Sequence, residues 1–200
     1  NLKTTARRDG DHYVVNGSKT FITSGMRADY YTVAVRTNPA DRGAGGVSLL
    51  LIERDTPGFT RTELKKMGWW ASDTAELFFQ DCRVPAENLL GPENSGFFTI
   101  MANFQAERLS LAIMAYMTAQ LALEQCLAYV KERTTFGKPL SKHQVIRHKL
   151  ADMLRQINTT QAWIDQCAWS VREGKAFPGD FALLKVQATR TMEYCAREAC

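Results

Sequence analysis

The chain has 200 residues, of which 45% are hydrophobic and 23% are charged. It is therefore long enough for one large domain or two modest ones, and this composition excludes a disordered chain. The net charge is only +4 and the basic residues are dispersed, so nothing indicates a nucleic-acid-binding surface. No apolar run approaches the ~20 residues that a membrane span needs, and we predict neither nucleic acid nor a membrane span. The cysteines lack metal-ligand spacing, which predicts reduced thiols and no metal site.

The first part of the chain carries strand signals. Between residues 4 and 84, short apolar runs of strand length alternate with turns, and Asn16-Gly17 is the pair typical of a tight hairpin turn. The glycine-rich segment 38–46 leads into a strand and lacks the Lys-Ser/Thr pair of a phosphate loop, so it indicates a hairpin connection. We predict a β domain over residues 1–88, incomplete at its N-terminus and folded as an antiparallel barrel or sandwich.

Residues 89–96 break the strand pattern and predict a linker. The remainder is helical: one helix covers about 97–132, a second runs from about 142 to 172 with Ser141 as a cap, and a third follows the cap Asp180. Short connections predict that these are three helices of an up-and-down four-helix bundle over residues 97–200. The fold class is thus α+β and multidomain. Because no Met begins the chain and no cap ends it, we expect a fragment that is truncated at both ends.

A carboxylate interrupts an apolar stripe of the first long helix. At helical spacing this stripe contains Ile100, Phe104, Glu107, Leu111, Met114, Thr118 and Leu121. We predict that it faces the other helices, where loss of water would make Glu107 a stronger base. The helix pattern taken alone favours a different interpretation, a carboxylate at the edge of the stripe paired with a cation such as Arg108.

Three separated segments resemble the flavin-dependent acyl-CoA dehydrogenases. They are Thr-Phe-Ile-Thr-Ser-Gly at 20–25, Lys-Met-Gly at 66–68 with Asp-Thr-Ala-Glu-Leu-Phe-Phe at 73–79, and Arg-Thr-Thr-Phe-Gly-Lys at 133–138 with His-Gln at 143–144. The resemblance covers the whole chain in order and is closest to the long-chain branch. It implies an N-terminal helical domain, a middle β-barrel and a C-terminal four-helix bundle. It also implies FAD bound between these domains and across the subunit interface of a homo-oligomer, a dimer or tetramer.

The resemblance assigns cofactor contacts to the first segment. It implies that Phe21, Ile22 and Thr23 lie against the flavin ring, with Thr23 offering its hydroxyl or N–H near the N5/O4 edge. Phe21 replaces the Trp that is more usual there, which keeps the apolar face but loses the indole N–H. Without the resemblance, this segment would be an ordinary strand.

The third segment is assigned to the far end of the same cofactor. Arg133, Thr135 and Phe136 match a motif that reaches the adenine and pyrophosphate side of FAD on a neighbouring subunit, where a guanidinium suits phosphate oxygens. His143 and Gln144 match a His-Gln pair that contacts the same cofactor. Taken alone, Arg133 would be a cation at a helix C-terminus and His143 a surface residue.

The resemblance also implies a reaction. A base removes the α-proton of a fatty acyl-CoA while the β-hydrogen leaves as hydride to flavin N5, giving a trans-2-enoyl-CoA. In most members the base lies near the C-terminus, but in the long-chain and isovaleryl-type members it comes from this helix, at the position of Glu107. Gln105 and Arg108 then resemble the substrate-side residues on the same turn.

Three hypotheses therefore remain from the sequence. The first is a dehydrogenase that passes electrons to an electron-transfer flavoprotein, in the cytoplasm or the mitochondrial matrix. The second keeps the fold but is an acyl-CoA oxidase or a flavin monooxygenase. The third is a helical scaffold that has lost its cofactor. With only part of the expected flavin site present, we expect the fragment to bind FAD weakly or not at all.

Overall fold

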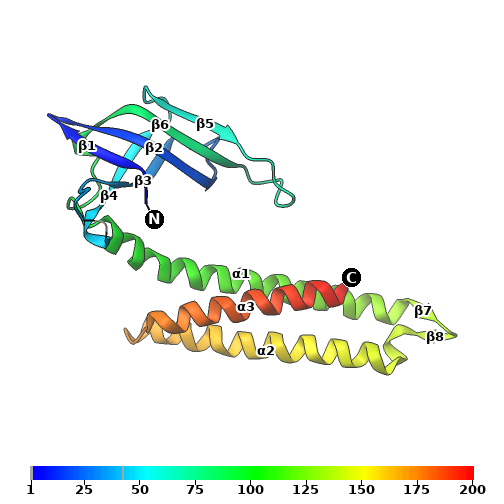
Figure 1. The fold of residues 1–200 in the computed structure, drawn as a ribbon. Helices are drawn as coiled ribbons and strands as arrows, with labels where there is room; N and C mark the ends of the chain where they lie inside the picture. Colours follow the sequence, from blue (N-terminus) through cyan, green and yellow to red (C-terminus); the bar gives the residue numbers. More distant parts are fainter. Residues whose placement is uncertain (1, 42) are drawn as a thin grey trace. The chain divides into compact units, whose positions relative to one another are not determined.

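The computed structural model describes residues 2–41 and 43–200, which form two compact units, Asn1–Met101 and Ala102–Cys200. The first unit is a β-sheet domain and the second is helical, as Figure 1 shows for each. This confirms the predicted α+β fold class, with strands followed by three helices. The predicted boundaries 1–88, 89–96 and 97–200 stay predictions.

One mixed sheet builds the first unit. Its strands are β1 Thr5–Asp9, β2 His12–Thr23, β3 Tyr30–Arg36, β4 Val47–Glu53, β5 Phe59–Glu63 and β6 Thr74–Pro85, in the order β4-β3-β1-β2-β6-β5. The pairs are antiparallel except for β1 with β3. Within the described residues β4 and β5 are edge strands that do not pair with each other, so the sheet is open and is not a closed barrel.

Alternating side chains place one face of this sheet in a core. Tyr13 and Val15 of β2 are fully buried and lie opposite Val84 and Cys82 of β6, because cross-strand partners share a face. The same core contains further buried side chains from every strand of the sheet. Because this face is buried, the register of β2 against its neighbours is fixed, which positions the C-terminal end of β2.

The predicted Asn16-Gly17 hairpin turn is wrong. The β1–β2 turn is Gly10-Asp11, where Gly10 has a φ of 62°, and Asn16-Gly17 lies inside β2 at a register shift. Glycine is needed at position 17 because a Cβ there would lie 2.8 Å from the Thr4 Cα atom. A close backbone approach, which local sequence does not reveal, thus explains this glycine.

Three helices build the second unit: α1 Gly96–Glu132, α2 Gln144–Arg172 and α3 Pro178–Ala199, of which α1 begins in the first unit. A hairpin of β7 Thr134–Thr135 and β8 Lys138–Pro139 follows α1. The predicted caps Ser141 and Asp180 are wrong by two and three residues, since His143 and Phe177 occupy the cap positions. The α3 helix can begin at Pro178 because a proline lacks only an N–H that would have no partner there.

The prediction that the Glu107 stripe faces the other helices is wrong. Small residues of α1, Ala112, Ala115 and Ala119, are buried together with large side chains of α2 and α3 such as Ile164 and Phe181. The stripe itself is largely exposed, with Leu111 at 44%, Met114 at 44% and Leu121 at 53%. Because α1 is apolar on most of its circumference, hydrophobic periodicity could not identify its inner face.

The α1 helix also meets the length and composition of a membrane span. Its 37 residues include an 18-residue window with a mean hydropathy of 1.2, of which 22% is buried. The expectation that no apolar run approaches this limit is therefore wrong. Core helices of bundles pass the same test, so the finding alone does not place α1 in a membrane.

Candidate active site

The end of β2 presents a strained aromatic side chain. A register shift between Lys19 and Ile22 displaces Thr20 and Phe21 from the regular ladder with β6. Phe21 has a φ of 61° and its side chain is 77% exposed. A left-handed backbone costs about 1–2 kcal/mol for such a residue, so the fold holds an apolar ring outward at an energetic cost.

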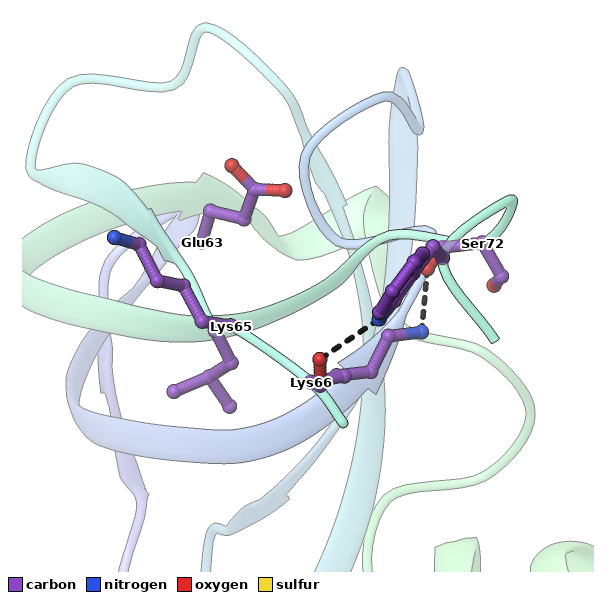
Figure 2. A pocket seen from close by; sticks show the side chains of 6 residues that line it. Glu63, Lys65, Lys66 and Ser72 are labelled. Atoms are coloured by element: carbon purple, nitrogen blue, oxygen red, sulfur yellow. Dashed lines mark hydrogen bonds between the residues drawn. The ribbon is translucent and has the colours of Figure 1, made fainter. Parts of the chain in front are cut away.

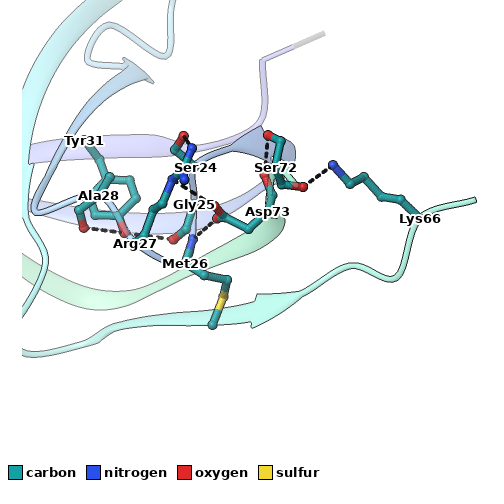
Figure 3. Close-up of polar contacts among 9 residues, drawn as sticks. All are labelled: Ser24, Gly25, Met26, Arg27, Ala28, Tyr31, Lys66, Ser72 and Asp73. Carbon is teal, nitrogen blue, oxygen red and sulfur yellow. Dashed lines mark hydrogen bonds and ion pairs between the residues drawn. The ribbon is translucent and has the colours of Figure 1, made fainter. Parts of the chain in front are cut away.

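The loop after β2 is tied to the start of β6. The Ser24 N–H donates to the Asp73 carbonyl oxygen at 3.1 Å, and the Met26 N–H donates to Asp73 Oδ2 at 2.7 Å. Arg27 Nε lies 3.2 Å from Asp73 Oδ1, and Figure 3 shows these contacts gathered around the side chain and backbone of Asp73. Asp73 belongs to a segment that carries the resemblance, but its role could not be predicted, since its partner Met26 lies 47 residues away in sequence.

A neighbouring loop forms a shallow pocket of about 370 Å³ in the first unit. Figure 2 shows Glu63, Lys65, Lys66 and Ser72 on its wall, with Trp70 donating its Nε1–H to the Lys66 carbonyl oxygen at 3.0 Å. The Lys66 ammonium donates to the Ser72 carbonyl oxygen, next to Asp73. This pocket therefore adjoins the segment that anchors the β2 loop.

Glu107 lies on an exposed part of α1. Its Oε1 atom accepts a hydrogen bond from Asn103 Nδ2 at 2.6 Å, and it lines an open hollow of about 360 Å³ with Ala106, Ser110 and Leu111. No ion pair of the described residues includes Glu107, so the structure does not show the Arg108 pairing that the helix pattern favoured.

Arg108 and Gln105 contact each other on the same turn. Arg108 Nη1 donates to Gln105 Oε1 at 3.5 Å, and the guanidinium lies 5.7 Å from the centre of the Phe104 ring. Gln105 also lines an apolar cavity of about 440 Å³ between α1 and the α2–α3 connection. An amide, a carboxylate and a guanidinium thus lie within the four residues Gln105 to Arg108, about one helical turn.

The hairpin after α1 also presents a strained aromatic side chain. Phe136 and Gly137 at its tip have φ values of 50° and 77°, and the Phe136 side chain is 97% exposed. Thr135 Oγ1 lies 3.2 Å from His143 Nε2, and the rings of Phe136 and His143 are 6.3 Å apart. Exposed Arg133 and Gln144 flank this group in the chain.

These residues suit a flat, partly anionic cofactor. Three aromatic side chains lie exposed in left-handed backbone, Phe21 and Trp69 in the first unit and Phe136 in the second, and none of them buries most of its surface within the described chain. Apolar rings pack against a planar ring system, and Arg133 offers the forked donors that phosphate accepts. The observed side chains therefore fit FAD.

Comparison with known proteins decides the family. The model of the acyl-CoA dehydrogenase middle domain matches residues 1–82, and that of the C-terminal domain matches residues 94–200. The chain belongs to the acyl-CoA dehydrogenase family. The acyl-CoA dehydrogenase resemblance that the three sequence segments carried is thereby confirmed, including its extent over the middle and C-terminal parts.

Individual relatives agree with this assignment. The chain is 39% identical to the mitochondrial long-chain specific acyl-CoA dehydrogenase of Mus musculus, over 98% of this chain and 46% of that protein. A probable acyl-CoA dehydrogenase from Mycobacterium abscessus superposes with a TM-score of 0.96 at 50% identity, over 100% of this chain and 53% of that one. A glutaryl-CoA dehydrogenase from Mycobacterium smegmatis in complex with FADH2 superposes with a TM-score of 0.92 at 32% identity, over 99% and 50%.

This acyl-CoA dehydrogenase chain spans about half the length of the curated relatives it matches. The assignments of Glu107, of the cofactor contacts and of the substrate-side residues stay predictions.

Proposed function

We propose that the whole protein oxidises a fatty acyl-CoA thioester to the trans-2-enoyl-CoA with FAD as cofactor. The observation that carries this proposal is Glu107, an accessible carboxylate at the edge of a hollow on α1 in a chain of this family. In the long-chain members that this chain resembles, the base lies at the position that Glu107 occupies on this helix. Membership of the acyl-CoA dehydrogenase family rests on the match to the two domain families and does not depend on Glu107.

Glu107 is the proposed base for the α-proton. An α-C–H is a weak acid, so the base must be held in place and kept from water when substrate binds. The Asn103 amide holds Oε1 at 2.6 Å, while no hydrogen bond of the described residues engages Oε2, which is free to accept the proton. Arg108 and Gln105 bind and orient the substrate beside it.

FAD, when bound, supplies the acceptor for the β-hydride at flavin N5. Phe21, Ile22 and Thr23 hold the ring system, in which the exposed Phe21 ring excludes water from one side. The group Arg133, Thr135, Phe136, His143 and Gln144 binds the adenine and pyrophosphate portion, with Thr135 fixing the His143 ring through their 3.2 Å contact. We propose that this second group serves a neighbouring subunit of a homo-oligomer, a dimer or tetramer.

Replacing Glu107 tests the mechanism. In the full-length protein, Glu107→Gln can still accept the hydrogen bond from Asn103 but cannot take up a proton. Enoyl-CoA formation should therefore fall about 100- to 10,000-fold. Flavin absorbance of the purified variant should be unchanged, because Glu107 is not assigned to the cofactor. Product formation is measured with an artificial electron acceptor over a panel of acyl-CoA chain lengths.

The same helix offers a matched control. Glu124 is exposed and accepts a hydrogen bond from Gln120 Nε2 at 2.9 Å, four residues earlier, as Glu107 does from Asn103. Glu124→Gln should leave turnover unchanged. Retention of most activity in Glu107→Gln would remove the proposed base, and rapid oxygen consumption by the reduced wild type would favour an acyl-CoA oxidase or a flavin monooxygenase instead.

The remaining assignments follow from the same proposal. An electron-transfer flavoprotein is the proposed electron acceptor, in the cytoplasm or the mitochondrial matrix. Both compartments are proposed because the relatives include a mitochondrial protein from Mus musculus and a protein from Mycobacterium abscessus.

A further inference from the structure

A single carboxylate fixes the loop that follows the proposed flavin-facing residues. Asp73 Oδ2 accepts the Met26 N–H at 2.7 Å, and Oδ1 pairs with Arg27 Nε at 3.2 Å, so both oxygens are engaged. The Asp73 side chain is only 16% exposed. Hydrogen bonds to an ionised carboxylate are shorter and stronger than those between neutral groups, and shielding from water strengthens them further.

The backbone of Asp73 continues the same connection. Its carbonyl oxygen accepts the Ser24 N–H at 3.1 Å, and the next residue, Thr74, pairs with Thr23 at the end of β2. Thr23 itself is therefore held by its pairing with β6, and the residues that follow it are held by three contacts to Asp73. These contacts join segments that are 47 residues apart in sequence.

The opposite side of the loop is also fixed. The Tyr31 hydroxyl is buried against the loop and lies 2.8 Å from the Gly25 carbonyl oxygen and 3.0 Å from that of Ala28. A Cβ at Gly25 would lie 2.6 Å from the Ala75 Cβ atom, so the loop packs directly on β6. As Figure 3 shows, the loop lies between Tyr31 and Asp73.

This fixation explains how the strained backbone persists. Phe21 and Ser24 both have left-handed φ values, 61° and 59°, on either side of Ile22 and Thr23. Such residues keep their conformation only where surrounding contacts determine it. Asp73 contacts the residues that follow Thr23. The Lys66 ammonium in turn donates to the carbonyl oxygen of Ser72, the residue before Asp73.

We propose that Asp73 is a positioning residue that sets the orientation of Ile22 and Thr23 toward the flavin ring. This inference rests on the proposed function, because it takes FAD as the ligand of that segment. Without the carboxylate, Met26 and Arg27 lose their common partner, and the loop is tied to this region only by the Ser24 N–H bond to the backbone carbonyl of residue 73 and by the packing of Gly25 on Ala75. The Thr23 hydroxyl or N–H is then no longer held for the N5/O4 edge, which weakens FAD binding and alters its redox potential.

The test uses the full-length protein with Asp73→Ala, Asp73→Asn and Arg27→Gln. Asp73→Ala should raise the FAD dissociation constant about tenfold or more, the factor expected when a charge-assisted hydrogen bond is lost. It should also shift the flavin midpoint potential and the visible absorption bands. Asp73→Asn should recover part of the affinity, because its amide oxygen still accepts the Met26 N–H while the pairing with Arg27 is lost.

Arg27→Gln guards against a folding defect. The Arg27 side chain is 65% exposed, so its replacement removes only the ion pair and the 3.3 Å hydrogen bond that Arg27 Nη2 donates to Ser24 Oγ, and it should give a smaller shift in potential with an unchanged melting temperature. Asp29→Asn is the matched control: Asp29 is 78% exposed, lies 3.6 Å from Arg54 and should leave affinity and potential as in the wild type.

The outcomes separate this inference from the proposed function. If wild-type protein carries no FAD or forms no enoyl product, the proposed function fails. If wild type binds FAD but both Asp73 variants bind it equally well with the wild-type potential, the positioning role is overturned. A lower melting temperature of Asp73→Ala with unchanged potential would likewise overturn it, since that is the result of a purely structural contact.

Discussion

Lys19 directs its side chain toward the apolar face of the β-sheet. On β2 it lies opposite Leu77, which is 2% exposed, and partners across a ladder share a face. Burial lowers the pKa of Lys19 to about 8 from its usual 10.5, because the charged amine loses water. The same sheet buries the Cys82 thiol, which raises its pKa to about 11 from 9.0.

These two pKa shifts change the free energy of unfolding in opposite directions as pH rises. Between pH 8 and 10.5 the unfolded chain keeps the Lys19 proton that the folded chain has released, so the Lys19 contribution to stability rises with pH. Above pH 9 the unfolded chain loses the Cys82 proton that the folded chain retains, so the Cys82 contribution falls.

We predict that Lys19→Met stabilises the 200-residue chain at pH 7, because it removes a partly buried charge and keeps the apolar stem. The difference in unfolding free energy between variant and wild type should shrink as pH rises from about 8 toward 10.5. Urea unfolding over this range measures it, and the Cys82 effect cancels in the difference. An equal difference at every pH would show that Lys19 keeps its ordinary titration.

At the scale of an element, the β7–β8 hairpin carries an unsuitable residue at its tip. Positive φ values at both Phe136 and Gly137 define a type I′ turn, for which Asn-Gly is the favoured pair. A phenylalanine costs about 1–2 kcal/mol in left-handed backbone, and its exposed ring recovers none of this within the chain. A strained, exposed aromatic is typical of a ligand contact.

We predict that Phe136→Asn raises the free energy of unfolding by about 1 kcal/mol, since Asn tolerates this backbone. In the full-length protein the same change should weaken FAD binding, because the ring is lost. Phe136→Ala is the control: it loses the ring but keeps the strain, so it should weaken FAD equally without the gain in stability. A stabilised variant with unchanged FAD affinity would exclude Phe136 from the cofactor site.

The elements also show how much of the structure could be predicted from the sequence. The spacing of strands, breaks and helices predicted the order of elements, and short motifs located the residues of the candidate site. The inner face of α1 could not be predicted, because alanines and larger apolar residues alternate around it. Asp73 and Gly17 were equally hidden, since their roles depend on contacts with Met26 and Thr4, far away in sequence.

At the scale of the whole molecule, the outer stripe of α1 is an apolar face that the described residues leave uncovered. Four of its large side chains, Phe104, Leu111, Met114 and Leu121, are between 38% and 53% exposed. Contiguous apolar surface of this kind marks an interface in soluble proteins, or a site of aggregation. It agrees with the proposal that the protein works as a homo-oligomer.

We predict that the 200-residue chain self-associates through this stripe. Replacing Met114 and Leu121 together with Gln should lower the association constant about tenfold or more, since each loses roughly 1 kcal/mol or more of apolar burial. Sedimentation velocity over a range of concentrations measures it. Thr118→Gln on the same face is the control and should change little, and a wild-type chain that is monomeric throughout would contradict the prediction.

The arrangement of α1 separates two kinds of selective constraint. Its buried residues, among them Ala112, Ala115 and Leu123, pack against the other two helices, whereas the exposed side chains of the outer stripe, including Glu107, lie outside this core. Descendants of one ancestral helix could therefore exchange the outward residues, and acquire new substrate preferences, while inheriting the bundle unchanged.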